Sequence, residues 1–103
     1  MIVVVGQFRF PPEQMAAALP AMRKVMEATR AEDGCIEYQP VIDADGLGPN
    51  HTALGPDTFV VIEKWASMDA LKAHAASAHM AAYAAKTREH VAGRVVHVLQ
   101  SAA

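Results

Sequence analysis

Residues suited to proton transfer and aromatic packing gather in one stretch of the chain, from Phe59 to Tyr83. Glu63 and the only tryptophan, Trp65, stand two positions apart, and two histidines and a tyrosine follow. A carboxylate next to a partly buried imidazole tunes that imidazole for proton transfer near neutral pH. The types and order of these residues therefore indicate acid–base chemistry in apolar surroundings.

A strand is predicted from about Thr58 to Trp65, because the apolar run FVVI leads directly to the tryptophan. Side chains alternate between the two faces of a strand, so Glu63 and Trp65 share one face with Phe59. Ser67 is a suitable N-cap for a following helix, with Asp69 in its first turn. The pattern predicts a strand, a turn and a helix that bring a carboxylate and an indole to the same side.

His74 is expected to face the sheet rather than water, because Leu71, His74, Ala75 and Ala78 fall on one helical stripe. An isolated histidine on such a stripe is more often a core residue with one satisfied nitrogen than a catalytic one. The nearby Glu63 and Trp65 shift the balance toward a functional role, although the core alternative stays open.

The remaining elements follow from periodicity, prolines and glycines. Pro12 is expected to open the first helix, Pro20 to kink it or delay its regular start, and Pro40 to mark an edge position or a bulge. Ser77 is expected to divide the second helical segment, whose later part ends before Gly93. The predicted elements are a strand at 2–10, a helix at 12–32, a strand at 35–42, a loop at 43–57, a strand at 58–65, a helix from 67, a helix at 79–90 and a strand at 94–100.

The order β-α-β-β-α-β predicts a ferredoxin-like α+β domain with helices on one face of an antiparallel sheet, and residues 1–103 are expected to form a single domain. The runs IVVV and FVVI are apolar on both faces, so something other than the helices must cover the second face of the sheet. A second copy of the chain is the simplest cover. We therefore expect a homodimer with sheet packed on sheet.

Composition excludes several classes of function. The formal net charge is −2 and no basic stripe is present, so nucleic acid is not an expected partner. No apolar run has membrane-spanning length and no signal-peptide pattern follows Met1, which predicts a cytoplasmic protein without a membrane partner. The lone Cys35 is expected to be a small buried hydrophobic residue rather than a disulfide or metal ligand.

Bound cofactors are not expected either. No glycine-rich loop follows a strand and opens a helix, as dinucleotide binding would require. His74 and His79 are five residues apart, and on one helix this spacing does not give the single-face pair of a zinc site. His51 lies in the loop at 43–57, which has the length of a lid or of an arm that reaches a partner, and a solvated position is expected for it.

Three sequence features occur together with this order of elements: GCIEY at 34–38, E-x-W at 63–65, and W-x-S-x-x-A-L-x-x-H continuing into S-x-H-M-x-x-Y. With them the chain resembles the antibiotic biosynthesis monooxygenase (ABM) domain family of dimeric α+β barrels. The resemblance covers essentially the whole chain and is close to the bacterial quinol monooxygenases of that family. It implies a homodimer that oxidises hydroquinones or other electron-rich aromatic compounds with O₂, without flavin, haem or metal.

For such chemistry the resemblance implies a base, an oxyanion donor and an aromatic-lined pocket. We assign the base or proton shuttle to His74, oriented by Glu63 if the two side chains are within reach, with His79 as a second candidate base. The expected substrate-binding residues are Trp65, Phe59, Tyr38, Tyr83 and Met80.

Other functions remain open at this point. Haem-binding or haem-degrading relatives use an asparagine on the first strand, where this chain has Gln7, together with a tryptophan and a histidine. An isomerase or sensor acting on phosphorylated metabolites should need a cationic pocket, and Lys64 lies on the strand face opposite Trp65. A non-catalytic dimer that binds a small molecule is the last alternative.

Overall fold

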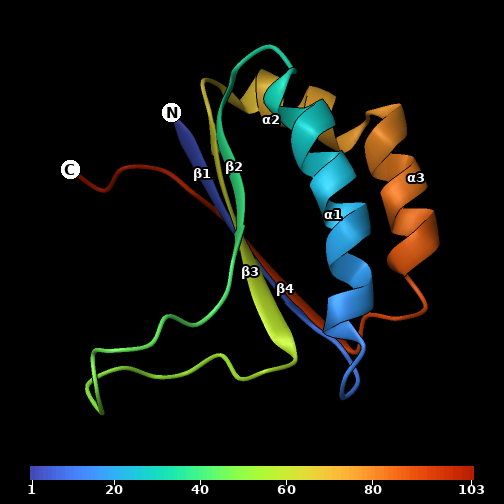
Figure 1. The fold of residues 1–103 in the computed structure, drawn as a ribbon. Helices are drawn as coiled ribbons and strands as arrows, with labels where there is room; N and C mark the ends of the chain where they lie inside the picture. The colour runs from blue at the N-terminus through green and yellow to red at the C-terminus, as the bar shows by residue number, and fades with distance from the viewer.

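The computed structural model describes residues 1–103, which form a four-stranded antiparallel sheet with three helices on one face (Figure 1). The order of elements confirms the predicted ferredoxin-like α+β fold, with the second helical segment divided in two. The elements are β1 (Ile2–Arg9), α1 (Met15–Arg30), β2 (Cys35–Val41), β3 (Thr58–Trp65), α2 (Met68–Ala75), α3 (Ala78–Thr87) and β4 (Gly93–Leu99).

The sheet has the strand order β2-β3-β1-β4, so the two strands with apolar residues on both faces are the central ones. Register places Glu63 opposite Val4 of β1 and Tyr38 of β2, and Trp65 opposite Cys35. All of these residues lie on the helix side of the sheet. The edge position predicted from Pro40 is confirmed, but the bulge lies between Cys35 and Glu37 instead.

The first helix begins at Met15, so the prediction that Pro12 opens it was wrong. Glu13 has a left-handed backbone with φ of 69°, and its N–H donates to the Asp57 carboxylate at 3.1 Å. These contacts hold the residues after β1 in a turn that the helix cannot include. The helix then continues through Pro20 and ends at Arg30, which leaves Glu32 in the turn before β2.

The second helical segment breaks at Ser77, as the sequence predicts. The Ser77 hydroxyl donates to the His74 carbonyl at 2.7 Å, and the Ser77 backbone is extended where α3 begins. The third helix ends at Thr87, three residues before the predicted end, and Gly93 is the first residue of β4 rather than part of a helix end. His74 and His79 therefore belong to two different helices.

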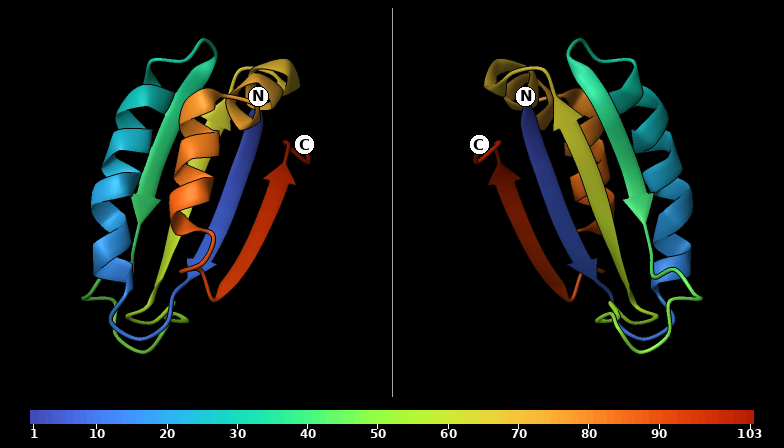
Figure 2. Two further views of the ribbon diagram at one scale, coloured as in Figure 1. Left: turned by 90° about the vertical axis from the view of Figure 1, so that its right-hand side faces the viewer. Right: turned by 90° about the vertical axis from the view of Figure 1, so that its left-hand side faces the viewer.

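The helices leave the other face of the sheet bare, and β4 extends beyond them at the edge (Figure 2). Side chains on the helix side form the hydrophobic core, which contains Val4, Phe10, Ala18, Met22, Val25, Tyr38, Phe59, Val61 and Trp65. On β4, by contrast, Val95, Val96, Val98 and Leu99 are all exposed. No helix has both the length and the apolar character needed to cross a membrane.

Candidate functional site

The structure brings Glu63, Trp65 and His74 into one cluster between β3 and α2. The Trp65 indole N–H donates to Glu63 Oε1 at 2.9 Å, and the Trp65 and His74 rings lie 4.7 Å apart between centroids. Strand alternation places the first two side chains on the helix face, and the apolar stripe of α2 directs His74 down onto them. The His74 ring is 4% exposed.

The carboxylate that holds His74 is Glu32, which corrects the assignment of that role to Glu63. His74 Nδ1 lies 2.7 Å from Glu32 Oε2, a charge-assisted hydrogen-bond distance, whereas His74 Nε2 lies 3.8 Å from Glu63 Oε1. Glu63 is engaged by the indole instead. Glu32 is therefore a candidate functional residue that the sequence pattern did not reveal.

A second imidazole faces the same carboxylate. His79 Nε2 lies 3.4 Å from Glu32 Oε2, and the Thr29 and Ser77 hydroxyls lie 3.2 and 3.4 Å from the same nitrogen. The two histidine ring centroids are 5.9 Å apart. We refer to Glu32, His74 and His79 as the Glu32 cluster, in which one carboxylate oxygen lies between two imidazoles.

The five-residue spacing of His74 and His79 predicts no shared metal site, but this prediction assumes that both residues lie on one helix. The break at Ser77 changes the direction of the chain between them, so both rings point toward the turn that follows α1. One ligand atom from each residue of the Glu32 cluster lies within 4.8 Å of the other two. The two histidines are therefore close enough to share a site, contrary to what their spacing on a single helix predicts.

Burial raises the pKa of Glu63 above its ordinary value of 4.5, and the negative charge of Glu32 raises it further. The indole hydrogen bond and the His74 imidazole oppose this rise. A carboxyl group with a raised pKa holds its proton to higher pH. Glu63 is therefore suited to fix the indole rather than to act as a permanently ionised partner of His74.

The four remaining predicted site residues occupy different places around this cluster. The Tyr38 ring lies 5.6 Å from the His74 ring and is almost fully buried, which raises the pKa of its hydroxyl. Tyr83 is half-buried, and burial raises its pKa to about 12. Met80 packs against the hydrophobic core, and Phe59 is a fully buried member of that core.

A cavity of about 150 Å³ opens beside the Glu32 cluster between α1 and α3. His79 and Tyr83 line it together with Val25 and Ala82, and the exposed Lys24 and Lys86 stand at its rim. Small molecules in the cavity would meet the His79 ring first, because His74 lies beneath it.

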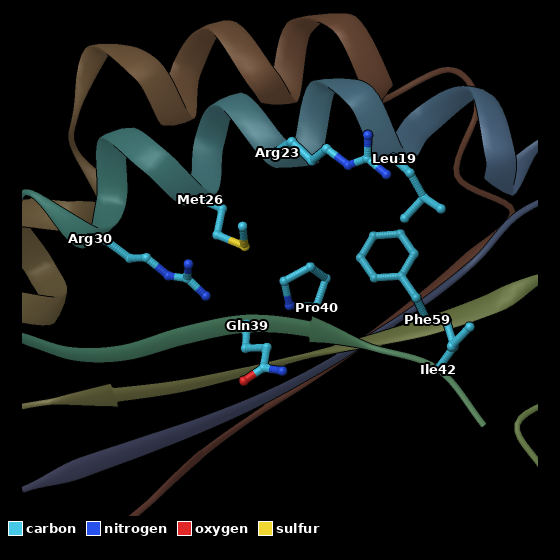
Figure 3. A pocket seen from close by; sticks show the side chains of 8 residues that line it. All are labelled: Leu19, Arg23, Met26, Arg30, Gln39, Pro40, Ile42 and Phe59. Atoms are coloured by element: carbon cyan, nitrogen blue, oxygen red, sulfur yellow. The ribbon is translucent and has the colours of Figure 1, made fainter. Parts of the chain in front are cut away.

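A larger cavity of about 350 Å³ lies on the other side of α1, against β2 (Figure 3). Arg23 and Arg30 approach it from the helix, and Phe59 is its point of contact with the predicted site residues. The Arg30 Nε–H donates to the Tyr38 carbonyl at 3.0 Å. Neither of these two cavities is lined by Trp65, Glu63 or His74, so a shared substrate pocket of Trp65 and Phe59 stays a prediction.

Of three other residues with expected positions, Gln7 and His51 lie apart from the Glu32 cluster, whereas Cys35 adjoins it and its N–H donates to the Glu32 carbonyl at 3.2 Å. Gln7 is exposed and pairs with Val60 on the sheet face opposite the helices, so it cannot share a pocket with Trp65 and His74 as the haem alternative requires. His51 is exposed in its loop. Cys35 is partly buried, and its burial and the neighbouring carboxylates raise its pKa.

Comparison with known sequences identifies relatives along almost the whole chain. The family described as antibiotic biosynthesis monooxygenase matches residues 1–86. A probable quinol monooxygenase, YgiN of Escherichia coli K12, is 31% identical over 102 residues, which cover 97% of each protein.

Solved structures agree with this assignment. The crystal structure of an antibiotic biosynthesis monooxygenase superposes with a TM-score of 0.83 at 27% identity, and the match covers 100% of both chains. Rv0793 from Mycobacterium tuberculosis superposes with a TM-score of 0.81 at 28% identity, over 99% of this chain and 95% of its own.

Proposed function

Since the chain belongs to the antibiotic biosynthesis monooxygenase family, we propose that it oxidises a hydroquinone or a similar electron-rich aromatic compound with O₂ and without a bound cofactor. The observation that carries this proposal is the cavity that opens onto His79 of the Glu32 cluster. This cavity places the His79 imidazole, a candidate base, next to a space that is lined partly by apolar side chains. The name of YgiN supports a quinol as the substrate class.

In the proposed reaction His79 accepts a proton from the substrate hydroxyl. Glu32 stabilises the resulting imidazolium, and His74 holds the carboxylate in place through its short hydrogen bond. The phenolate passes one electron to O₂, and recombination of the two radicals forms a carbon–oxygen bond. Loss of water then leaves the hydroxylated quinone, so that one oxygen atom of O₂ enters the product and the other leaves as water.

Tyr83 is the proposed hydrogen-bond donor in the cavity. Its raised pKa of about 12 keeps the hydroxyl protonated at any working pH, so it can donate to a substrate oxygen or to reduced oxygen. Trp65 acts indirectly in this account, because it packs on His74 and holds Glu63 rather than stacking on the substrate.

We also propose that residues 1–103 act as a single domain that forms a homodimer through the bare face of the sheet. The exposed Val95 and Leu99 of β4, which lie on that face, and the absence of helices there support this assembly. A second copy would remove these side chains from water. The loop at 43–57 projects on the side of the sheet away from the helices (Figure 1), whereas the larger cavity lies between α1 and β2.

Oxygen uptake with menadiol as substrate tests the proposed function. We expect chelator-treated wild-type protein to consume O₂ above the rate of autoxidation, His79→Ala to lose about 100-fold or more of the enzymatic rate, and His90→Ala to retain it. His90 is exposed just after α3 and serves as the matched control. Equal uptake by all three proteins after subtraction of the background would contradict the proposal.

A further inference from the structure

The donor atoms of the Glu32 cluster form a set that transition metals favour. Two imidazole nitrogens and one carboxylate oxygen converge from the turn after α1, from α2 and from α3. Such a set suits Zn²⁺, Co²⁺ and Fe²⁺, whereas Mg²⁺ and Ca²⁺ prefer sites made of oxygen ligands. We propose that Glu32, His74 and His79 bind one divalent transition-metal ion such as Zn²⁺.

The distances in the Glu32 cluster come close to those of a tetrahedral zinc site. Ligand atoms at zinc-bond lengths near 2.1 Å are separated from one another by roughly 3.4 Å. The separation between Glu32 Oε2 and His79 Nε2 is 3.4 Å, and that between Glu32 Oε2 and His74 Nδ1 is 2.7 Å. The second pair must open by about 0.7 Å when an ion replaces the shared proton, and the two imidazole nitrogens, which lie within 4.8 Å of each other, must take up a similar separation.

The position of Glu32 allows that adjustment. It lies outside α1 in the turn before β2, and its side chain is 20% exposed. His79 is 27% exposed and lines the smaller cavity, so an ion can reach the cluster from solvent. The imidazole of His74 is already fixed by packing against Trp65.

The surroundings also match those of a metal site. With Nδ1 of His74 on the metal, its Nε2 lies 3.8 Å from Glu63 Oε1, so a small shift of the ring would bring these two atoms to hydrogen-bond distance. A carboxylate behind a metal-bound histidine is a recurrent arrangement that orients the ring. The fourth coordination position falls to a water molecule or to a hydroxyl of Thr29 or Ser77, both of which neighbour His79 Nε2.

Metal binding and cofactor-free oxygenation use the same atoms in mutually exclusive ways. An ion on His79 Nε2 and Glu32 removes the base and its stabilising carboxylate, so Zn²⁺ acts as an inhibitor that competes with protons. This consequence rests on the proposed function. The binding of the ion itself does not depend on the proposed function.

Titration of tag-free, chelator-treated protein tests the binding directly. We expect isothermal calorimetry to show one Zn²⁺ per chain, and Co²⁺ to give the intense ligand-field absorption of a tetrahedral site with nitrogen and oxygen donors. His79→Ala and Glu32→Gln should lose saturable binding while their circular dichroism stays that of the wild type. Glu63→Gln should weaken binding about tenfold, because it disturbs only the residue behind His74.

His90→Ala and His51→Ala are the matched controls, since both histidines are exposed and lie outside the cluster. The proposal is overturned if Zn²⁺ does not bind saturably, if binding survives in both His79→Ala and Glu32→Gln, or if either control removes it. If the Glu32 cluster is only a hydrogen-bond network without metal affinity, Zn²⁺ will not bind saturably.

Activity provides a separate measurement. Inhibition of menadiol oxidation by stoichiometric Zn²⁺, reversed by chelator, would support both proposals. Saturable binding to an enzyme with no oxidase activity would leave the metal site intact and contradict the proposed function. Undiminished oxidation in the Zn²⁺-loaded protein would instead contradict the assignment of the Glu32 cluster as the base.

Discussion

The two carboxylates beside His74 differ in their surroundings, and this difference separates their roles. Glu32 lies at the edge of the helix layer and faces two imidazoles, whereas Glu63 lies deeper and accepts the indole hydrogen bond. Burial raises the pKa of Glu63. Two titratable groups in different environments can serve one site in different protonation states.

The raised pKa of Glu63 predicts a specific dependence of stability on pH. The folded state binds this proton more tightly than the unfolded chain, so its contribution to stability is full below pH 4.5 and is lost as the pH rises through the raised pKa. Glu63→Gln removes the ionisation but keeps an acceptor for the indole. We expect the free energy of unfolding of the wild type to fall relative to that of Glu63→Gln as the pH rises above 4.5.

Urea denaturation at several pH values measures this difference. Glu27→Gln is the control, because Glu27 is exposed on α1 and forms no ion pair. A constant difference between wild type and Glu63→Gln across the range would show that Glu63 has an ordinary pKa.

Tyr83→Phe tests the donor proposed for the smaller cavity. Loss of one neutral hydrogen bond to substrate or reduced oxygen should lower kcat/KM by about 2- to 10-fold, in line with a net value of 0.5–1.5 kcal/mol per bond. Thermal stability should stay nearly unchanged, because the phenol hydroxyl has no protein partner in the structure. Unchanged kinetics with menadiol would remove Tyr83 from the mechanism.

At the scale of elements, much of the arrangement could be predicted from the sequence. Strand alternation placed Glu63 and Trp65 on one face, and the apolar stripe placed His74 above them. Glu32 could not be identified in this way, because its contact with His74 spans 42 residues and depends on where α1 ends. One signal was available: consecutive antiparallel strands bring the residues just before the first strand close to those just after the second, as the observed pairing of Cys35 with Trp65 illustrates.

The cavities were beyond prediction for a related reason. Their walls come from the packing of α1 against α3 and against β2, which periodicity alone does not fix. The same limitation applies to the two histidines. Spacing along one helix kept them apart, and only the angle between α2 and α3 brings their rings together.

Gly34 controls how the turn carrying Glu32 meets α2. Its φ is +81°, and a Cβ added there would lie 2.6 Å from the Ala70 Cβ. Gly34→Ala should therefore lower the free energy of unfolding by about 3 kcal/mol through backbone strain and overpacking together. The oxidation rate should fall as well, because Glu32 moves relative to His74.

Gly48→Ala is the matched control for that variant. Gly48 has a similar φ of +87°, but nothing lies within 4 Å of an added Cβ. Strain alone should cost about 1 kcal/mol and leave the oxidation rate unchanged. Equal losses of stability in the two variants, measured by urea denaturation, would show that the contact between the turn and α2 is not tight.

At the scale of the whole molecule, the bare face of the sheet accounts for the unusually exposed β4. Val95 is 50% exposed and lies on the face opposite the helices. In the proposed homodimer the same side chain is buried. The assembly, rather than the protomer, would then complete the burial of apolar surface that the central strands require.

Val95→Lys tests this assembly. We expect the wild type to sediment at twice the chain mass of 11.0 kDa, and Val95→Lys to sediment as a monomer, because a lysine in an apolar interface loses its hydration. Ala85→Lys, on the exposed surface of α3, should remain a dimer. A wild type that sediments as a monomer at micromolar concentration would contradict the proposed assembly.

The central claim is that Glu32 acts through the imidazoles of its cluster to remove a proton from the substrate. A double-mutant cycle of kcat for menadiol oxidation, with chelator present, tests it most directly. Glu32→Gln should lower kcat by about 10- to 100-fold in the wild type and have no further effect in His79→Ala, since its partner is then absent. Losses that multiply in the double variant, or a Glu32→Gln protein with full kcat, would contradict the account.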